Sequence, residues 1–292
     1  LTWNPVGNIQ VRGAFSQTIT RPQFRELAAA DFVDPDLGIT LTGNPFLQNS
    51  EIDNFDIRAE WYFDRGEFLT VGLFYKDITN PIEQFQTGRE ANSTSFLNAP
   101  SAEVYGVEFE FEKNFALDEI FDAEFWDARE LFFATNYTYS KSEVSSDGTV
   151  IIASPPGATG IQPREFDGAN VINDGRALQG QSDHLFNLQL GIENQDTGTR
   201  VTGLLNYASE RVVLPAANAT DPAVFEQPPI SLDLVVNQTV EVGGKEFGLD
   251  LKVQNLLGED YNAYREDQSG AEAPFLQYDR GTTFSIGLDY DF

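Results

Sequence analysis

The 292-residue chain contains no cysteine and a single histidine, which excludes disulfides, thiolate metal sites and multi-histidine metal centres. Basic residues are also scarce, since 18 Lys and Arg stand against 46 Asp and Glu, giving a formal net charge of −28. This balance argues against nucleic acid as a partner, because phosphates demand a basic surface. No apolar run approaches the roughly 18 residues of a membrane helix, and no signal peptide opens the sequence. Methionine is absent even at position 1, so we expect a processed chain or a piece of a longer one.

Apolar residues are nevertheless abundant, at 41% hydrophobic and 13% aromatic, and they alternate with polar ones. From residue 9, the odd positions hold Ile9, Val11, Gly13, Phe15 and then Ile19, and the even positions hold Gln10, Arg12, Ala14, Ser16 and Thr18. A period of two predicts a strand with one apolar and one polar face. The same pattern recurs along the chain and predicts ten strands, near residues 9–19, 55–63, 69–75, 105–111, 131–139, 186–192, 201–207, 230–236, 247–253 and 284–292.

The apolar faces of these predicted strands carry no charge, whereas the polar faces carry many. A lipid-facing surface requires this, since a charge at mid-bilayer costs about 2–4 kcal/mol, but a soluble barrel would also separate its faces. The lengths of the connections favour a membrane barrel over a soluble one. Short links at 64–66, 196–199 and 243–246 alternate with long ones such as 22–50, 80–100 and 146–181. Short periplasmic turns and long extracellular loops are typical of outer-membrane barrels. We therefore predict an all-β fold, a transmembrane antiparallel up-and-down β-barrel.

Several short stretches carry a resemblance to a known family. They are FSQTITRP at 15–22, GNP at 43–45, IRAEWY at 57–62, GLFYKDI at 72–78, PIE at 81–83, GVE at 106–108, LQGQSD at 178–183, PISLD at 229–233, QNLL at 254–257 and YDF at 290–292. In this order they resemble the C-terminal part of the barrel of TonB-dependent receptors, which are active transporters in the outer membrane of Gram-negative bacteria.

The resemblance implies that residues 1–292 are a portion of one β-barrel domain, about ten C-terminal strands of a 22-stranded barrel. The family's plug domain and TonB box are not visible in this sequence and are expected upstream. The implied function is energy-coupled uptake of a solute, an iron chelate or a carbohydrate, with the TonB–ExbB–ExbD complex as partner. The alternative is a self-contained, porin-like passive channel in contact with the same outer-membrane lipid.

The polar faces and the loops supply the candidate site residues. The lumen-facing candidates, which would line the solute route and contact the plug, are Arg12, Asp56, Arg58, Glu60, Glu108, Glu110 and Glu112. The candidates for ligand contact in the long loop at 146–181 are Arg164, Phe166, Asn170 and Arg176. Tyr290 and Phe292 resemble the C-terminal signal that the outer-membrane barrel assembly machinery recognises. We predict no catalytic, metal or cofactor site.

Two further segments have a second interpretation. Ser182, Asp183 and His184 could suggest a barrel hydrolase, but a nucleophile needs a base that a third group orients, and Asp183 would point away from the other two. Residues 118–130 carry six carboxylates and apolar residues at roughly helical spacing, which predicts a short amphipathic helix in a solvated acidic link.

Overall fold

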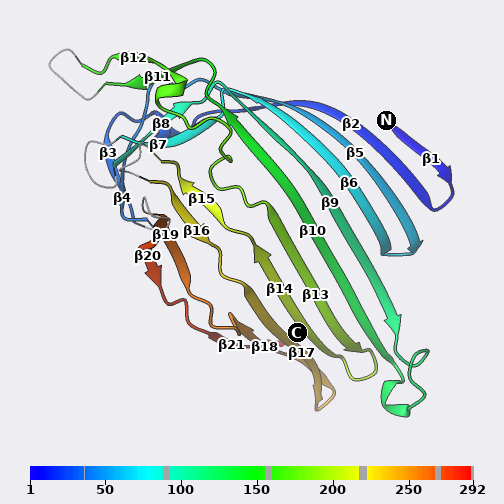
Figure 1. The fold of residues 1–292 in the computed structure, drawn as a ribbon. Helices are drawn as coiled ribbons and strands as arrows, with labels where there is room; N and C mark the ends of the chain where they lie inside the picture. The colour runs from blue at the N-terminus through cyan, green and yellow to red at the C-terminus, as the bar shows by residue number, and fades with distance from the viewer. Residues whose placement is uncertain (36, 88–92, 155–159, 217–221, 267–270, 291–292) are drawn as a thin grey trace.

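The computed structural model describes residues 1–292 except 36, 88–92, 155–159, 217–221, 267–270 and 291–292. Its main feature is one curved antiparallel sheet of eleven strands (Figure 1). In spatial order these are β1 (Thr2–Val6), β2 (Ile9–Thr20), β5 (Ser50–Asp64), β6 (Glu67–Thr79), β9 (Ser101–Ala116), β10 (Arg129–Ser145), β13 (His184–Asn194), β14 (Thr199–Ala208), β17 (Ser231–Val242), β18 (Lys245–Gln254) and β21 (Thr283–Tyr290). Each strand of this sheet pairs with the strand of the same sheet that comes before it and the one that comes after it along the chain, so the up-and-down topology is confirmed.

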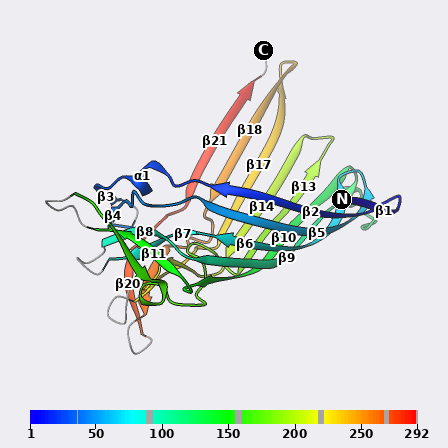
Figure 2. The ribbon, with the colours of Figure 1, turned by 90° about the horizontal axis from the view of Figure 1, so that it is seen from above.

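The sheet is part of a barrel rather than a closed one. Its two edges, β1 and β21, are separate in the view from above (Figure 2). Ten of its strands coincide with the ten predicted ones. The eleventh, β1, contains Pro5 and had no alternating signature. Proline cannot donate to a neighbouring strand and is therefore tolerated at a sheet edge, which is where β1 lies.

The long connections gather at one end of the sheet and are themselves folded. They contain three small sheets, which we call together the loop layer: β3 (Asp31–Asp34), β4 (Ile39–Thr42), β8 (Ser93–Asn98) and β7 (Ile82–Gln86); β11 (Thr149–Ala153) and β12 (Pro163–Asp167); and β15 (Arg211–Leu214), β16 (Val224–Gln227), β19 (Tyr261–Glu266) and β20 (Glu272–Tyr278). A short helix, α1 (Phe24–Leu27), and a 3-10 turn, η2 (Gly168–Asn170), complete it. None of the helices within the described ranges is long and apolar enough to cross a membrane.

The loop layer has an apolar core to which four connections contribute. Ile39, Leu41, Phe96, Leu214, Val224 and Ala263 are buried together there. Asn44, which is fully buried, donates from its side-chain amide to the backbone carbonyls of Phe96 (3.0 Å) and Ile151 (2.9 Å). Gly43 beside it has no room for a side chain, because a Cβ would lie 2.3 Å from the Ala28 carbonyl oxygen. The GNP stretch at 43–45 therefore joins three connections.

The apolar faces of the large sheet are exposed, whereas in a soluble barrel they would be buried. On β21 the exposed fractions of Phe284, Ile286 and Leu288 are 74%, 78% and 70%. The other exposed apolar residues on these faces include Phe15, Ile19, Phe55, Ile57, Trp61, Val71, Leu73, Tyr75, Tyr105, Phe109, Leu190, Ile192, Val201, Tyr207 and Leu251. Continuous exposed apolar surface on this scale indicates contact with lipid rather than water.

The predicted amphipathic helix at 118–130 is wrong. This turn between β9 and β10 contains only a 3-10 turn, η1 (Glu124–Trp126). The Leu117 amide bonds the Arg129 carbonyl (2.9 Å) and closes the turn, while the Phe121 and Trp126 rings meet at 4.9 Å. Helix nucleation is costly in so short a segment, and here ring packing and loop closure outweigh the helical spacing of the apolar residues.

Candidate functional site

The polar face of the large sheet brings together three of the lumen-facing candidates, Arg12, Arg58 and Glu60. Arg58 Nε lies 2.8 Å from Glu60 Oε1, and Arg12 Nη2 lies 3.5 Å from Glu60 Oε2. The Tyr62 hydroxyl donates to the same Oε2 at 2.8 Å. The two arginines stand opposite each other in the β2–β5 register, where like charges repel. The buried Glu60 carboxylate, 1% exposed, lies between them and offsets that repulsion.

Thr70 continues the row that starts at Glu60. It is paired with Glu60 on one side and with Glu110 on the other, so three polar residues lie side by side across β5, β6 and β9. Thr70 is 4% exposed, and its hydroxyl makes no hydrogen bond within the described part of the chain. Buried hydroxyls are normally bonded, so Thr70 is an exception on this face.

The remaining lumen-facing candidates lie on the same face without joining the Arg12–Glu60–Arg58 cluster. Asp56 stands opposite Ala14 and Phe74. Glu108 stands opposite Gly72, where a Cβ would lie 3.7 Å from the Glu108 Cβ. Glu110 and Glu112 reach a hollow farther along the sheet.

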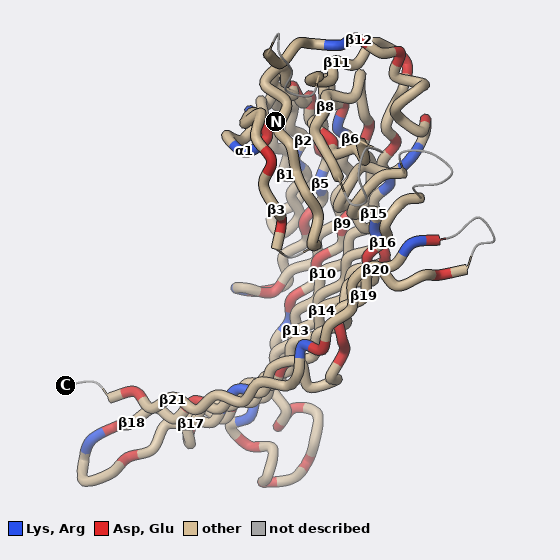
Figure 3. Tube along the Cα trace, turned by 90° about the vertical axis from the view of Figure 1, so that its left-hand side faces the viewer, with Lys and Arg blue, Asp and Glu red and all other residues tan. Residues whose placement is uncertain are grey.

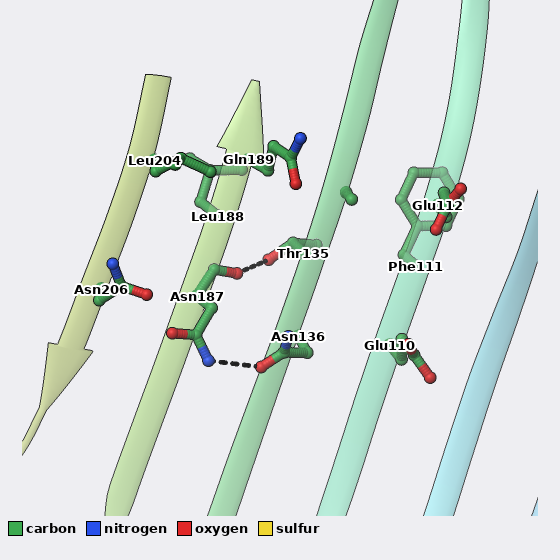
Figure 4. A pocket seen from close by; sticks show the side chains of 11 residues that line it. Glu110, Phe111, Glu112, Thr135, Asn136, Asn187, Leu188, Gln189, Leu204 and Asn206 are labelled. Carbon is green, nitrogen blue, oxygen red and sulfur yellow. Dashed lines mark hydrogen bonds between the residues drawn. The ribbon is translucent and has the colours of Figure 1, made fainter. Parts of the chain in front are cut away.

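That hollow, which we call the amide pocket, has a volume of about 260 Å³ and lies between β9, β10, β13 and β14 (Figure 4). Its polar lining consists of Glu110, Glu112, Thr135, Asn136, Asn187, Gln189 and Asn206. The Asn187 amide donates to Asn136 Oδ1 at 2.7 Å, and the Thr135 hydroxyl donates to the Asn187 carbonyl at 3.0 Å. The pocket thus offers amide donors and acceptors beside two carboxylates.

A second hollow of about 310 Å³ adjoins the first, and Gln189 lines both. We call it the phenylalanine pocket, because Phe132 lines it next to the side-chain-free Gly191. Asn114, Glu130, Glu193, Arg200 and Thr202 supply its polar lining. Arg200 Nε donates to Glu193 Oε2 at 2.9 Å, so the basic side chain of this pocket is already paired.

Of the four loop candidates, three are exposed and one is partly buried. Arg164 and Phe166 lie on β12, all of which is exposed, and Asn170 ends η2 in an exposed position. Arg176 instead is 14% exposed, and its Nη1 lies 2.9 Å from Oε2 of Glu83, which is 5% exposed. Burial raises the pKa of the Glu83 carboxyl above its ordinary value, although Arg176 opposes the shift. Arg176 therefore ties the 146–181 connection to β7.

Ser182, Asp183 and His184 each have a different partner. The Ser182 hydroxyl donates to the Ser209 carbonyl at 2.6 Å, and Asp183 forms an ion pair with Lys141. His184 Nδ1 lies 2.8 Å from the Tyr137 hydroxyl. The three side chains therefore do not bond one another, and each contributes to strand ends instead.

At the C-terminal end, Tyr290 stacks on Phe247 of the paired strand, with ring centroids 4.9 Å apart, and Lys245 lies over its ring. Phe292 lies outside the described residues.

Sequence reasoning selected the charged residues of the polar face and missed its neutral ones. Thr70, Asn136, Asn187, Gln189 and Asn206 all occupy polar positions of predicted strands, so alternation assigns their face correctly. What places them side by side is the register between strands, which the short turns fix and which alternation in single strands does not give.

Comparison with known proteins agrees with this architecture. A family model described as "TonB dependent receptor-like, beta-barrel" matches residues 1–256. The structure is similar to a mutant of the ferric enterobactin receptor PfeA of Pseudomonas aeruginosa, with a TM-score of 0.59 at 14% identity, covering 100% of this chain and 39% of that one. A search of curated protein sequences finds no match.

Two further solved structures show the same fold. The FrpB iron transporter of Neisseria meningitidis has a TM-score of 0.57 at 11% identity, covering 100% of this chain and 38% of that one. The outer membrane transporter YddB of Escherichia coli has a TM-score of 0.55 at 11% identity, covering 98% and 39%. This chain thus spans about two fifths of the length of these relatives. With the family match over residues 1–256, the curved two-faced sheet and its loop layer identify the chain as a member of the TonB-dependent receptor β-barrel family.

Proposed function

We propose that residues 1–292 form the C-terminal portion of an outer-membrane barrel that takes up a solute with energy from the TonB–ExbB–ExbD complex of a Gram-negative bacterium. The observation that carries the proposal is the two-faced sheet. Its outward face is apolar, uncharged and exposed, as contact with outer-membrane lipid requires, while its polar face contains the ion cluster and both pockets. Transport, rather than catalysis, is the activity that this arrangement and the family support.

The polar face would line the lumen, and its Arg12–Glu60–Arg58 cluster would contact a plug domain. The exposure of its arginines supports this contact. The cluster presents two guanidinium groups, 54% and 47% exposed, whose outer N–H groups can bond carbonyl or carboxylate oxygens of a plug.

The exposed residues Arg164, Phe166 and Asn170 would meet the solute on the outside. They lie on β12 and η2 of the loop layer, which supplies the rigid support that recognition loops need.

Outer membranes from the source bacterium test this function without knowledge of the solute. An epitope-tagged full-length protein should migrate at more than about twice the 32.5 kDa of this chain, and its migration should change on heating. Chemical cross-linking in living cells should capture TonB. A heat-modifiable band near 32.5 kDa that yields no TonB adduct would overturn the proposal.

The end of β21 would be the segment that the barrel assembly machinery recognises, through Tyr290 and Phe292. Deletion of Phe292 from the full-length protein should lower the amount that reaches the cell surface, as measured by protease accessibility on whole cells. Replacement of Phe292 by tyrosine should preserve surface exposure, because position 292 stays aromatic. Undiminished surface exposure of the deletion variant would refute this assignment.

A further inference from the structure

The amide pocket and the phenylalanine pocket are two adjoining hollows on one wall, and neutral hydrogen-bonding groups line both. Gln189 lines both, with Asn136, Asn187 and Asn206 on one side and Asn114 and Thr202 on the other. Each volume lies near the lower end of the range for small-molecule sites. Figure 4 shows that the side chains of the amide pocket come from four neighbouring strands.

The charges of the two pockets disfavour an anion. The amide pocket is lined by Glu110 and Glu112 and by no basic residue. In the phenylalanine pocket, Glu130 and Glu193 outnumber Arg200, which is paired with Glu193. Acidic residues also outnumber basic ones along the described trace as a whole (Figure 3). An anionic ligand would meet like charges in both hollows, with no unpaired guanidinium or ammonium group in their lining to bind it.

The same groups suit a ligand that is rich in hydroxyls. Side-chain amides donate and accept, and carboxylates accept, so both can bond hydroxyl groups that do both. Phe132 lines the second pocket beside Gly191 and adds an aromatic surface against which an apolar ring face can pack.

We propose that these two pockets bind an uncharged saccharide on its way through the barrel, and that they discriminate against polyanionic chelates. This inference rests on the proposed transport function and names its substrate class.

Binding to the purified full-length protein in detergent tests the proposal. The probes are neutral hexasaccharides of α-glucan, β-glucan and β-mannan, with a ferric tris-catecholate as the anionic probe, all measured by calorimetry. At least one hexasaccharide should bind more tightly than the chelate. Gln189→Ala should weaken that binding about tenfold, as expected for the loss of one or two hydrogen bonds. Gln17→Ala, which removes the same side chain from the opposite face, should leave it unchanged.

A charge variant provides the second readout. The double variant Glu110→Gln with Glu112→Gln keeps the size of the amide pocket but removes its two charges. It should lower the ratio of the chelate's Kd to the hexasaccharide's Kd by about tenfold. Tighter binding of the chelate by the unmodified protein, no binding of any hexasaccharide, or equal effects of Gln189→Ala and Gln17→Ala would overturn the proposal. These failures would leave the TonB adduct intact, so they are distinguishable from failure of the transport function.

Discussion

At the scale of single residues, buried polar side chains hold the loop layer together. Asn44 bonds two carbonyls from different connections, and the Glu83–Arg176 pair joins the same two connections to each other. Sequence reasoning placed Arg176 among the ligand candidates because it is a charged residue in a long polar loop. Its burial depends on β7, which is far away in the chain, so no local pattern around Arg176 could have indicated its partner.

Removal of Arg176 gives a pH-dependent prediction. The pKa of Glu83 is raised in the folded protein, so this group favours folding most below its ordinary pKa of about 4.3 and less as the pH rises through the folded value. Arg176→Gln removes the group that opposes this rise. We expect a loss on the order of 3 kcal/mol in loop-layer stability at pH 7, and a smaller loss near pH 5.

Hydrogen exchange of β7 and β8 in the full-length protein at both pH values measures this effect. The double variant Glu83→Gln with Arg176→Gln should recover much of the protection at pH 7, because no buried charge remains. Arg164→Gln, at an exposed position of the same connection, is the control. A loss that is equal at both pH values would contradict the assignment to Glu83.

At the scale of elements, alternation located the strands that cross the membrane and missed those of the loop layer. Each of the ten predicted strands must present an apolar face to lipid over most of its length, and this leaves a period of two in the sequence. The strands of the loop layer have no such requirement. β4 and β8, for example, pair in parallel through Thr40 and Ser93, and their burial depends on contacts between connections.

The lipid face of β6 gives a prediction at this scale. Leu73 lies at the middle of the strand, is 56% exposed and belongs to the uncharged face. Leu73→Arg should cost about 2–4 kcal/mol of folding free energy in a bilayer, as a charge near the midplane does. Ala14→Arg, at an exposed position on the polar face of β2, should cost much less.

Urea unfolding of the full-length protein in lipid vesicles, followed by heat-modifiable gel migration, compares the two variants. If Leu73→Arg and Ala14→Arg lowered the unfolding free energy equally, the two faces of the sheet would not be in contact with different media. The assignment of the apolar face to lipid would then be wrong.

At the scale of the whole molecule, the open sheet is the dominant feature. Among the described residues, β1 and β21 each have one edge without a partner strand, and β21 exposes Phe284, Ile286 and Leu288. Unpaired strand edges are templates for association with other chains. The eleven-stranded sheet, together with its coverage of about two fifths of its relatives, supports the interpretation that other strands of the same barrel pair with these edges.

The isolated 1–292 chain should therefore not fold into a stable closed barrel. Refolded in detergent, it should give a broad urea transition, form oligomers through β1 and β21, and show no heat-modifiable migration. The full-length protein treated in the same way is the control. A sharp transition of a monomeric, heat-modifiable fragment would show that eleven strands close by themselves.

The shared core of the loop layer has a consequence for the immune recognition of this protein. Ile39, Phe96, Leu214 and Ala263 come from four connections and belong to one buried cluster. The surface that covers this cluster is therefore formed by four segments that are far apart in the sequence. An antibody raised against a peptide copy of one connection recognises the conformation of the free peptide. In the folded protein the same connection has a different conformation, which its neighbours hold in place. Antibodies that recognise the intact cell surface should therefore be elicited by the folded barrel, and their epitopes should be discontinuous in the sequence.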